Sequence, residues 1–218
     1  CLSRGLGDVY KRQVSDYSRD LSLDEAAAHV QYVCGGVVYR REYIVSYPDR
    51  VLAVRFTAEK DGNPVKGGLS FAVRLEIPFV RDYCIREGDG AGRTGEVSAD
   101  GDRLVMRGAS LYYNILCEGQ ARVTASGGRV ALNDGKITVS GADEAVLYFA
   151  CGTNYRMEPR VFSEPEPKKK LAPYPAPHDM VTELLDAAVS KGYEKIRADH
   201  ATDYPVSYTH LTLPTTSR

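Results

Sequence analysis

The sequence predicts a mainly β fold: a two-sheet antiparallel β-sandwich (a supersandwich), followed by a Pro-rich linker and one or two C-terminal α-helices. Three observations predict it. Between residues 27 and 150, short β-branched and aromatic runs alternate with turns rich in Gly, Asp, Asn and Pro. At Pro159 the composition changes to a Pro- and Lys-rich stretch. From His178 onward, apolar residues recur at helical spacing.

The predicted strands follow one another at the short spacing typical of a sandwich, in which paired sheets bury their apolar faces. Turn signals at Gly35-Gly36 and Tyr47-Pro48-Asp49-Arg50 separate neighbouring strands. Residues 81–95 are rich in charge and Gly and are predicted to form a surface loop. The predicted strands are 29–33, 37–45, 51–57, 69–75, 104–108, 111–118, 122–125, 129–132, 136–139 and 145–150.

Residues 159–177 are predicted to be a stiff, solvated linker, whose Lys168-Lys169-Lys170 run is exposed and forms no anion site. A helix should start at His178 or Asp179 and break at Gly192. With no further domain to cover its apolar face, we expect this helical tail to fray. The predicted apolar face comprises Met180, Leu184, Ala187, Ala188, Tyr193 and Ile196.

The two ends of the chain, residues 1–13 and 206–218, resemble translated sequencing adapter. The run VSYTHLTLPT is one reading frame of a transposon mosaic-end adapter, and SRGLGDVYKRQ corresponds to the opposite strand of its companion. A genuine disordered tail at each end is the alternative. The predicted domains are therefore 14–158 for the β-sandwich, 159–177 for the linker and 178–205 for the start of a helical region.

Composition excludes several partners. The 28 basic and 29 acidic residues give a net charge of −1, which predicts binding neither to nucleic acid nor to an anionic membrane. No apolar run reaches the roughly 18 residues that a membrane span needs. Outside the adapter-like ends, the cysteines lack metal-site spacing and have apolar neighbours, so buried thiols are predicted and a disulfide stays open. These cysteines are Cys34, Cys84, Cys117 and Cys151.

Several stretches resemble the inverting α-L-fucosidase family, glycoside hydrolase family ninety-five. Residues 17–27 match its Y-x-R-x-L-D-L start, with Ser22 replacing the usual Asp. Residues 36–51 resemble its G-V-x-Y-x-R-E-x-F-x-S-x-P-D-x-V stretch, which is the most specific match. Residues 140–155 carry G-A-D-x-A and then T-N-Y, and residues 187–204 resemble its helical linker.

The resemblance implies an N-terminal β-sandwich, a helical linker, an (α/α)₆ barrel and a small C-terminal β-domain. The family's catalytic residues lie in the barrel, so no catalytic, substrate-binding or metal residue is assigned to this chain. We therefore expect this chain to be inactive by itself, as the non-catalytic N-terminal portion of an α-L-fucosidase. The resemblance implies no cofactor, and as partners it implies the barrel and fucosylated glycans.

Two other functions stay open. One is a stand-alone carbohydrate-binding β-sandwich, which would bind sugar through exposed aromatic residues. The other is the N-terminal domain of a related disaccharide phosphorylase or hydrolase, which shares the sandwich, linker and barrel plan. The stretch from Arg41 to Asp49 is common to these relatives in outline and separates them only modestly.

Some charged residues invite a catalytic interpretation. Arg41-Glu42 lies on a predicted strand, where neighbours point to opposite faces, and a cross-strand or buried ion pair is the favoured prediction. The acids in residues 86–89 are predicted to be solvated. His200 and Asp203 share a helical face but lack a third metal ligand, so a docking contact to the barrel or a local hydrogen bond is expected.

Four tyrosines could form a sugar-stacking platform, but aromatic residues on strands are more often part of a core. We therefore expect core positions for them, and no sugar binding by the domain alone. The glycines of residues 88–92 do not open a helix after a strand, as a phosphate-binding loop requires. The four tyrosines are Tyr112, Tyr113, Tyr148 and Tyr155.

Overall fold

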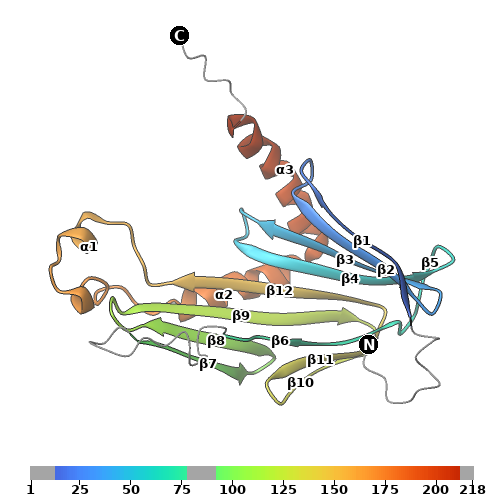
Figure 1. Ribbon diagram of the computed structural model, residues 1–218, viewed down its shortest axis with the longest axis horizontal. Helices are drawn as coiled ribbons and strands as arrows, with labels where there is room; N and C mark the ends of the chain where they lie inside the picture. Colours follow the sequence, from blue (N-terminus) through green and yellow to red (C-terminus); the bar gives the residue numbers. More distant parts are fainter. Residues whose placement is uncertain (1–12, 78–91, 212–218) are drawn as a thin grey trace, which may run out of the picture.

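The computed structural model describes residues 13–77 and 92–211, with side chains as far as Pro205. The predicted mainly β fold is confirmed: two antiparallel sheets are followed by helices at the C-terminal end (Figure 1). The strands are β1 (Val14–Ser22), β2 (Ala27–Cys34), β3 (Val37–Ser46), β4 (Val51–Lys60), β5 (Asn63–Pro64), β6 (Leu69–Arg74), β7 (Arg93–Asp100), β8 (Arg103–Ser110), β9 (Ile115–Ser126), β10 (Arg129–Asn133), β11 (Lys136–Ala142) and β12 (Glu144–Thr153). The helices are α1 (Pro159–Ser163), the 3₁₀ turn η4 (Pro167–Lys169), α2 (His178–Lys191) and α3 (Tyr193–Leu211).

The large sheet joins nine of the described strands in the order β1-β2-β3-β4-β12-β9-β8-β7, with β5 paired to β4. The small sheet has the order β10-β11-β6. Strand β12 returns from the small sheet to lie between β4 and β9, so it ties the two halves of the large sheet together. The predicted Gly35-Gly36 hairpin is confirmed, with φ of +60° and +75° at the two glycines.

The large sheet is the middle of three layers, because each of its faces is covered by a different element. Alternating residues of β9 show this: Ala121 and Val123 pack toward the small sheet, whereas Glu118 and Gln120 face α2. One core lies between the sheets and includes Leu104, Ile137 and Val139. The other lies between the large sheet and the helices, and includes Ile44, Val181, Leu185 and Ile196.

Several predicted strand boundaries were wrong. Residues 111–118 and 122–125 are not two strands, because β9 runs unbroken through Gly119. A Cβ at Gly119 would lie only 2.8 Å from the ring of Phe149, so this glycine leaves room for a core side chain. The predicted loop at residues 81–95 falls mostly outside the described residues, but its end from Arg93 onward belongs to edge strand β7.

The predicted linker, residues 159–177, is not wholly solvated. It contains α1 and η4, and the side chains of Val161 and Leu171 are buried. Lys170 donates from Nζ to the backbone oxygen of Val161 over 2.7 Å, which closes this segment on itself. The Pro-rich segment therefore forms a loop that packs on itself, in addition to connecting β12 to α2.

The predicted start of a helix at His178 and its break at Gly192, where φ is +78°, are both confirmed. The predicted apolar face is confirmed in part: Ala188, Tyr193 and Ile196 are buried, Met180 and Leu184 are partly buried, and Ala187 is exposed. The face also includes Val181 and Leu185, which are fully buried and were not predicted. The large sheet covers this face, so the reason given for fraying was wrong. Helix α3 continues through Pro205 to Leu211, and so extends into the segment predicted to be adapter.

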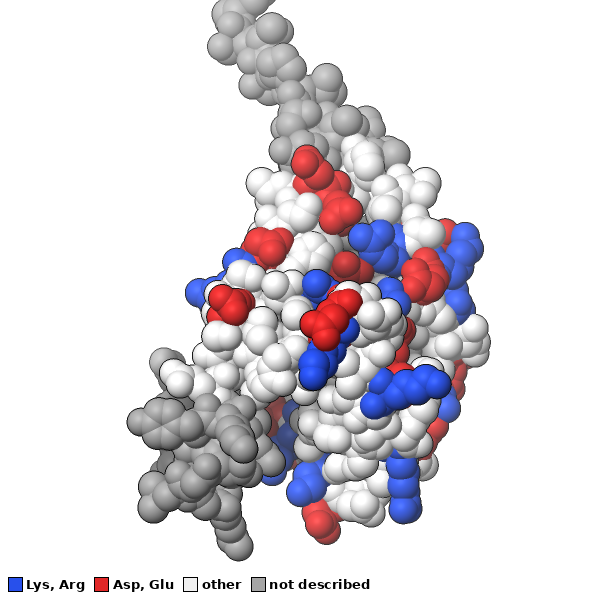
Figure 2. Space-filling model, turned by 90° about the vertical axis from the view of Figure 1, so that its right-hand side faces the viewer, with Lys and Arg blue, Asp and Glu red and all other residues white. Residues whose placement is uncertain are grey.

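The other calls on the chain ends fall largely outside the described residues, which exclude 1–12 and 212–218. Figure 2 shows acidic and basic side chains interspersed on the side of the molecule that it displays, as the near-balanced composition predicts. Within the described part of the chain, no helix is long and apolar enough to cross a membrane.

Candidate functional site

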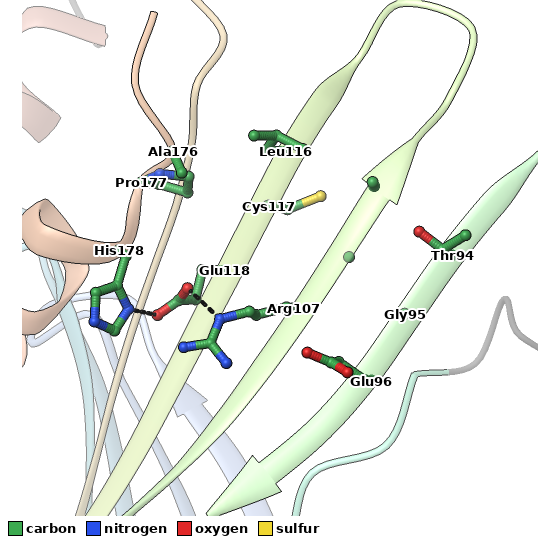
Figure 3. Close-up of a pocket in the computed structure, with 12 residues that line it drawn as sticks. Thr94, Gly95, Glu96, Arg107, Leu116, Cys117, Glu118, Ala176, Pro177 and His178 are labelled. Carbon is green, nitrogen blue, oxygen red and sulfur yellow. Dashed lines mark hydrogen bonds and ion pairs between the residues drawn. The ribbon is translucent and has the colours of Figure 1, made fainter. Parts of the chain in front are cut away.

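A pocket of about 350 Å³ opens where strands β7, β8 and β9 meet the start of α2 (Figure 3). Its polar wall consists of Glu96, Arg107, Glu118 and His178, one from each of these elements. The three strand residues are in register, because Glu96 pairs with Arg107 and Arg107 pairs with Glu118. Their side chains therefore emerge from the same face of the sheet.

Glu118 is the centre of this pocket, and its side chain is only 4% exposed. Its Oε1 accepts a hydrogen bond from Gln120 Nε2 at 2.7 Å and lies 2.7 Å from Nδ1 of His178. Its Oε2 accepts from Arg107 Nε at 3.1 Å. We call Arg107, Glu118, Gln120 and His178 the Glu118 cluster.

These contacts determine the charge state of Glu118. Burial raises the pKa of its carboxyl group, but hydrogen bonds from Gln120 and His178, together with the charge of Arg107, outweigh burial and hold the pKa below its ordinary value. A carboxylate that is kept ionised and has both oxygens occupied is unsuited to donate a proton. Figure 3 shows Arg107 on the strand between Glu118 and Glu96, where its guanidinium donates to Glu118.

The cluster continues along α2 through buried polar contacts. Gln120 is fully buried and also donates from Nε2 to Thr182 Oγ1 at 2.8 Å. Its Oε1 accepts from Arg103 at 3.1 Å, and Arg103 donates to Asp186 at 2.7 Å. His178, Thr182 and Asp186 follow at intervals of four residues and so share one helix face. The arrangement fixes α2 in one register on the sheet.

A second carboxylate, the half-buried Glu42 of β3, docks α3. Its Oε1 accepts from Arg197 Nε at 2.8 Å and from the Tyr193 hydroxyl, and its Oε2 lies 3.3 Å from His29 Nε2. Burial raises the pKa of Glu42, but the hydrogen bonds from Tyr193 and Arg197 hold it below its ordinary value. Burial and the same carboxylate raise the pKa of Tyr193 far above its usual range, so its hydroxyl remains a donor. We call His29, Glu42, Tyr193 and Arg197 the Glu42 cluster.

The structure separates Arg41 from Glu42. The Arg41 guanidinium lies 5.7 Å from the ring centroid of Tyr32 and 5.9 Å from that of Phe56, on the other face of β3. The predicted ion pair at Glu42 exists: its arginine partner is Arg197 of α3, and His29, its cross-strand neighbour on β2, lies 3.3 Å from the other carboxylate oxygen. A contact over 155 residues of sequence leaves no local signal.

His200 makes the expected docking contact, but to this chain's own β-domain. Its Nε2 lies 3.1 Å and 3.2 Å from the backbone oxygens of Glu25 and Ala26, in the turn between β1 and β2. Asp203 is half-buried and is not brought into this contact. Among the described residues, no three His, Cys, Asp or Glu side chains gather closely enough to hold a metal ion.

The predictions for the tyrosines, the acidic loop and the cysteines have different outcomes. Tyr148 is in the core as predicted, whereas Tyr112, Tyr113 and Tyr155 are 42%, 43% and 39% exposed, so their core assignment was wrong. Residues 86–89 and Cys84 lie outside the described residues. The other cysteines lie on strands but are less buried than predicted: Cys34 and Cys117 are half-buried and Cys151 is exposed.

Comparison with known families identifies this architecture. The model described as "Glycosyl hydrolase family 65, N-terminal domain" matches residues 6–158, from within the adapter-like segment to just beyond β12. This chain belongs to that family. The family 65 N-terminal domain thus comprises both sheets, and α2 and α3 follow it in the chain. In Figure 3, Glu118 and Arg107 belong to this domain, whereas His178 lies beyond it.

Two relatives extend the comparison. This chain is 25% identical over 166 residues to "Alpha-L-fucosidase 2" from Arabidopsis thaliana, a match that covers 65% of this chain and 17% of the relative. A solved structure described as "Putative kojibiose phosphorylase from human microbiome" has a TM-score of 0.56 at 11% identity. It covers 92% of this chain, which spans 26% of that structure, so the likeness is one of fold.

Sequence reasoning did not single out the Glu118 cluster. A signal was present in β9, where Glu118, Gln120 and Arg122 alternate with apolar residues inside a strand. Polar residues at every second position indicate a face that meets polar groups. The predicted strands end at Glu118 and resume at Arg122, so they divide this alternation in the family 65 N-terminal domain.

Proposed function

We propose that this chain is the non-catalytic N-terminal portion of an α-L-fucosidase, and that it braces a helical catalytic domain. The observation that carries the proposal is the 25% identity to the Arabidopsis fucosidase over 166 residues. The motif at residues 36–51 adds support, because it contains Glu42, the residue that anchors α3. The missing catalytic partner would be an (α/α)₆ barrel and the substrate a fucosylated glycan.

The bracing role follows from how α2 and α3 are held. The Glu118 and Glu42 clusters fix both helices on one face of the large sheet through ion pairs to a buried carboxylate, Glu118, and a half-buried one, Glu42. Ion pairs of this kind depend on geometry, because a displaced partner leaves an uncompensated buried charge. The helices would therefore present a following domain in a defined orientation.

The test compares this chain with a longer protein encoded by the same gene and its downstream sequence. We expect the longer protein to release fucose from p-nitrophenyl α-L-fucoside, and this chain alone to release none. Release of fucose by this chain alone would contradict the non-catalytic role. A longer protein that folds but hydrolyses no fucoside would contradict the fucosidase assignment.

A disaccharide phosphorylase is the second candidate parent, because a solved structure described as a putative kojibiose phosphorylase shares the fold. The kojibiose phosphorylase likeness covers nearly the whole chain, which agrees with this alternative in fold. The two are separated by incubating the longer protein with kojibiose, with and without inorganic phosphate. Phosphate-dependent formation of a sugar phosphate, without fucosidase activity, would establish the phosphorylase.

A further inference from the structure

An aromatic cleft lies at the end of the large sheet, away from both carboxylate clusters. It has a volume of about 300 Å³, at the lower end of the roughly 300–1,000 Å³ typical of small-molecule sites. Three aromatic side chains line it: Tyr113 before β9, Tyr155 after β12, and Phe162 of α1. Figure 1 places α1 beside the end of β12, at the left of the molecule.

The walls of the cleft are held in place by buried groups. Asn154 is only 2% exposed; its Oδ1 accepts from the amide of Leu116 at 2.9 Å, and its Nδ2 donates to the backbone oxygen of Asn114 at 3.1 Å. It therefore joins the turn that carries Tyr113 to the segment that carries Tyr155. Tyr113 also packs edge-on against Tyr112, with ring centroids 4.6 Å apart.

The opposite wall is anchored just as directly. Val161 and Leu171 are 6% and 1% exposed and contribute to the lining. The bond from Lys170 Nζ to the Val161 backbone oxygen closes the loop that presents Phe162. Phe162 itself is 66% exposed, although burying such an apolar ring stabilises a protein. A preformed cleft with an exposed ring at its rim is a feature of ligand sites.

The chemistry of the lining indicates the class of ligand. Aromatic ring faces carry partial negative charge and attract the polarised C–H bonds on the flat face of a sugar ring. The phenol hydroxyls of Tyr113 and Tyr155 can exchange hydrogen bonds with sugar hydroxyls. Lys170 is the one charged residue in the lining, and its ammonium group already donates to Val161. The other six residues that line the cleft are uncharged, so the cleft suits a mainly neutral ligand, to whose hydroxyls Lys170 can still donate.

We propose that this cleft binds a neutral oligosaccharide, with a sugar ring stacked on Tyr155 and Phe162. For the choice of ligand class, this inference rests on the proposed carbohydrate-directed function. The exposure of three of the four tyrosines removes the reason for expecting no sugar binding by this domain.

The test is titration of the isotope-labelled 218-residue chain with fucosyllactose and with kojibiose, followed by NMR. We expect saturable shifts centred on Tyr113, Tyr155 and Phe162 with at least one of the two sugars. Tyr155→Ala and Phe162→Ala should each weaken binding by about two- to tenfold, the equivalent of roughly 0.5–1.5 kcal/mol for one aromatic contact. Tyr47→Ala, at a residue 80% exposed in the turn before β4, is the matched control and should leave binding unchanged.

The outcomes separate this site from the proposed function. No binding of either sugar by the folded chain, or binding that survives both cleft substitutions, would overturn the site. Equal loss in the Tyr47→Ala control would also overturn it. A longer protein that releases fucose while this chain binds no sugar would overturn the site alone, and the reverse result would overturn the fucosidase assignment alone. Because Tyr155 and Phe162 are exposed, unchanged thermal unfolding should confirm that both variants fold.

Discussion

Arg197 of α3 donates from Nε to Oε1 of Glu42 on β3 over 2.8 Å, and so joins two residues 155 positions apart. Tyr193 donates to the same oxygen from one turn earlier on α3. The pair therefore fixes both the position and the rotation of the helix. This relationship explains why α3 lies against the β-domain instead of projecting freely from its first residue.

Removing the charge of Glu42 should release α3. Glu42→Gln preserves the shape of the side chain but leaves Arg197 without its anion, and we expect a loss of about 2 kcal/mol in unfolding free energy. Because the pKa of Glu42 is lowered in the fold, its contribution is present above pH 4.5 and is lost as the pH falls through the folded-state pKa. Urea denaturation at pH 7 measures the effect.

Glu59→Gln is the matched control, because Glu59 pairs with Arg40 at the surface. Surface pairs contribute only about 0–1 kcal/mol, so this substitution should cost clearly less than Glu42→Gln. Equal losses in the two variants would show that the Glu42 cluster is no more than a surface ion pair.

His29 should make stability depend on pH near neutrality. The hydrogen bond between His29 Nδ1 and Asp20, 2.9 Å long, raises the pKa of His29 above 6.5. Partial burial lowers this pKa, and the contact with Glu42 raises it further. A raised folded-state pKa stabilises the fold below pH 6.5, and this stabilisation is lost as the pH rises through the folded-state pKa. NMR titration of the His29 ring should give a pKa above 6.5.

Asp20→Asn should lower that pKa and flatten the dependence of unfolding free energy on pH between about 6 and 8. Asp61→Asn, in the turn after β4, is the control and should leave the His29 titration unchanged. A pKa at or below 6.5 in the unmodified chain would refute the role assigned to Asp20.

Gln120 should contribute more to the free energy of unfolding than is usual for an uncharged polar side chain. Gln120→Leu removes one partner each from Glu118, Thr182 and Arg103, and we expect a loss of roughly 2–3 kcal/mol because buried polar groups are left unsatisfied. Gln31→Leu is the control, since Gln31 accepts a hydrogen bond only from the exposed Arg40. Its cost should stay within about 0.5 kcal/mol in the same denaturation experiment.

The packing of α2 predicts that the helical region does not fray. Leu185 is fully buried against the sheet, so Leu185→Ala should cost about 2–5 kcal/mol, whereas Leu23→Ala, at a residue 61% exposed, should cost little. Hydrogen exchange gives a second measure: amides of residues 184–196 should be protected to the same degree as those of β9. Fast exchange there in the folded chain would show that the tail is detached.

The sequence-based predictions were correct where the interactions are local in sequence and wrong where they join distant segments. The strand between Gly36 and Pro48, the hairpin glycines and the helix break at Gly192 were predicted correctly, because turn geometry and local periodicity act over a few residues. Strand β7 was missed because it is a polar edge strand, formed by pairing with β8. The prediction divided β9 into two strands. Its continuity through Gly119 depends on packing against Phe149, a residue distant in sequence.

The sequence by itself determined a β-domain followed by one or two helices, since these depend on side-chain pattern and local turns. Only the tertiary structure decided that α2 and α3 cover the large sheet, that Glu42 pairs with Arg197, and that Glu118 lies beneath His178. It also decided that Tyr155 and Phe162 line a cleft. The physical reason is the same in each case: burial and ion pairing depend on which surfaces meet, and that is set by chain segments distant in sequence.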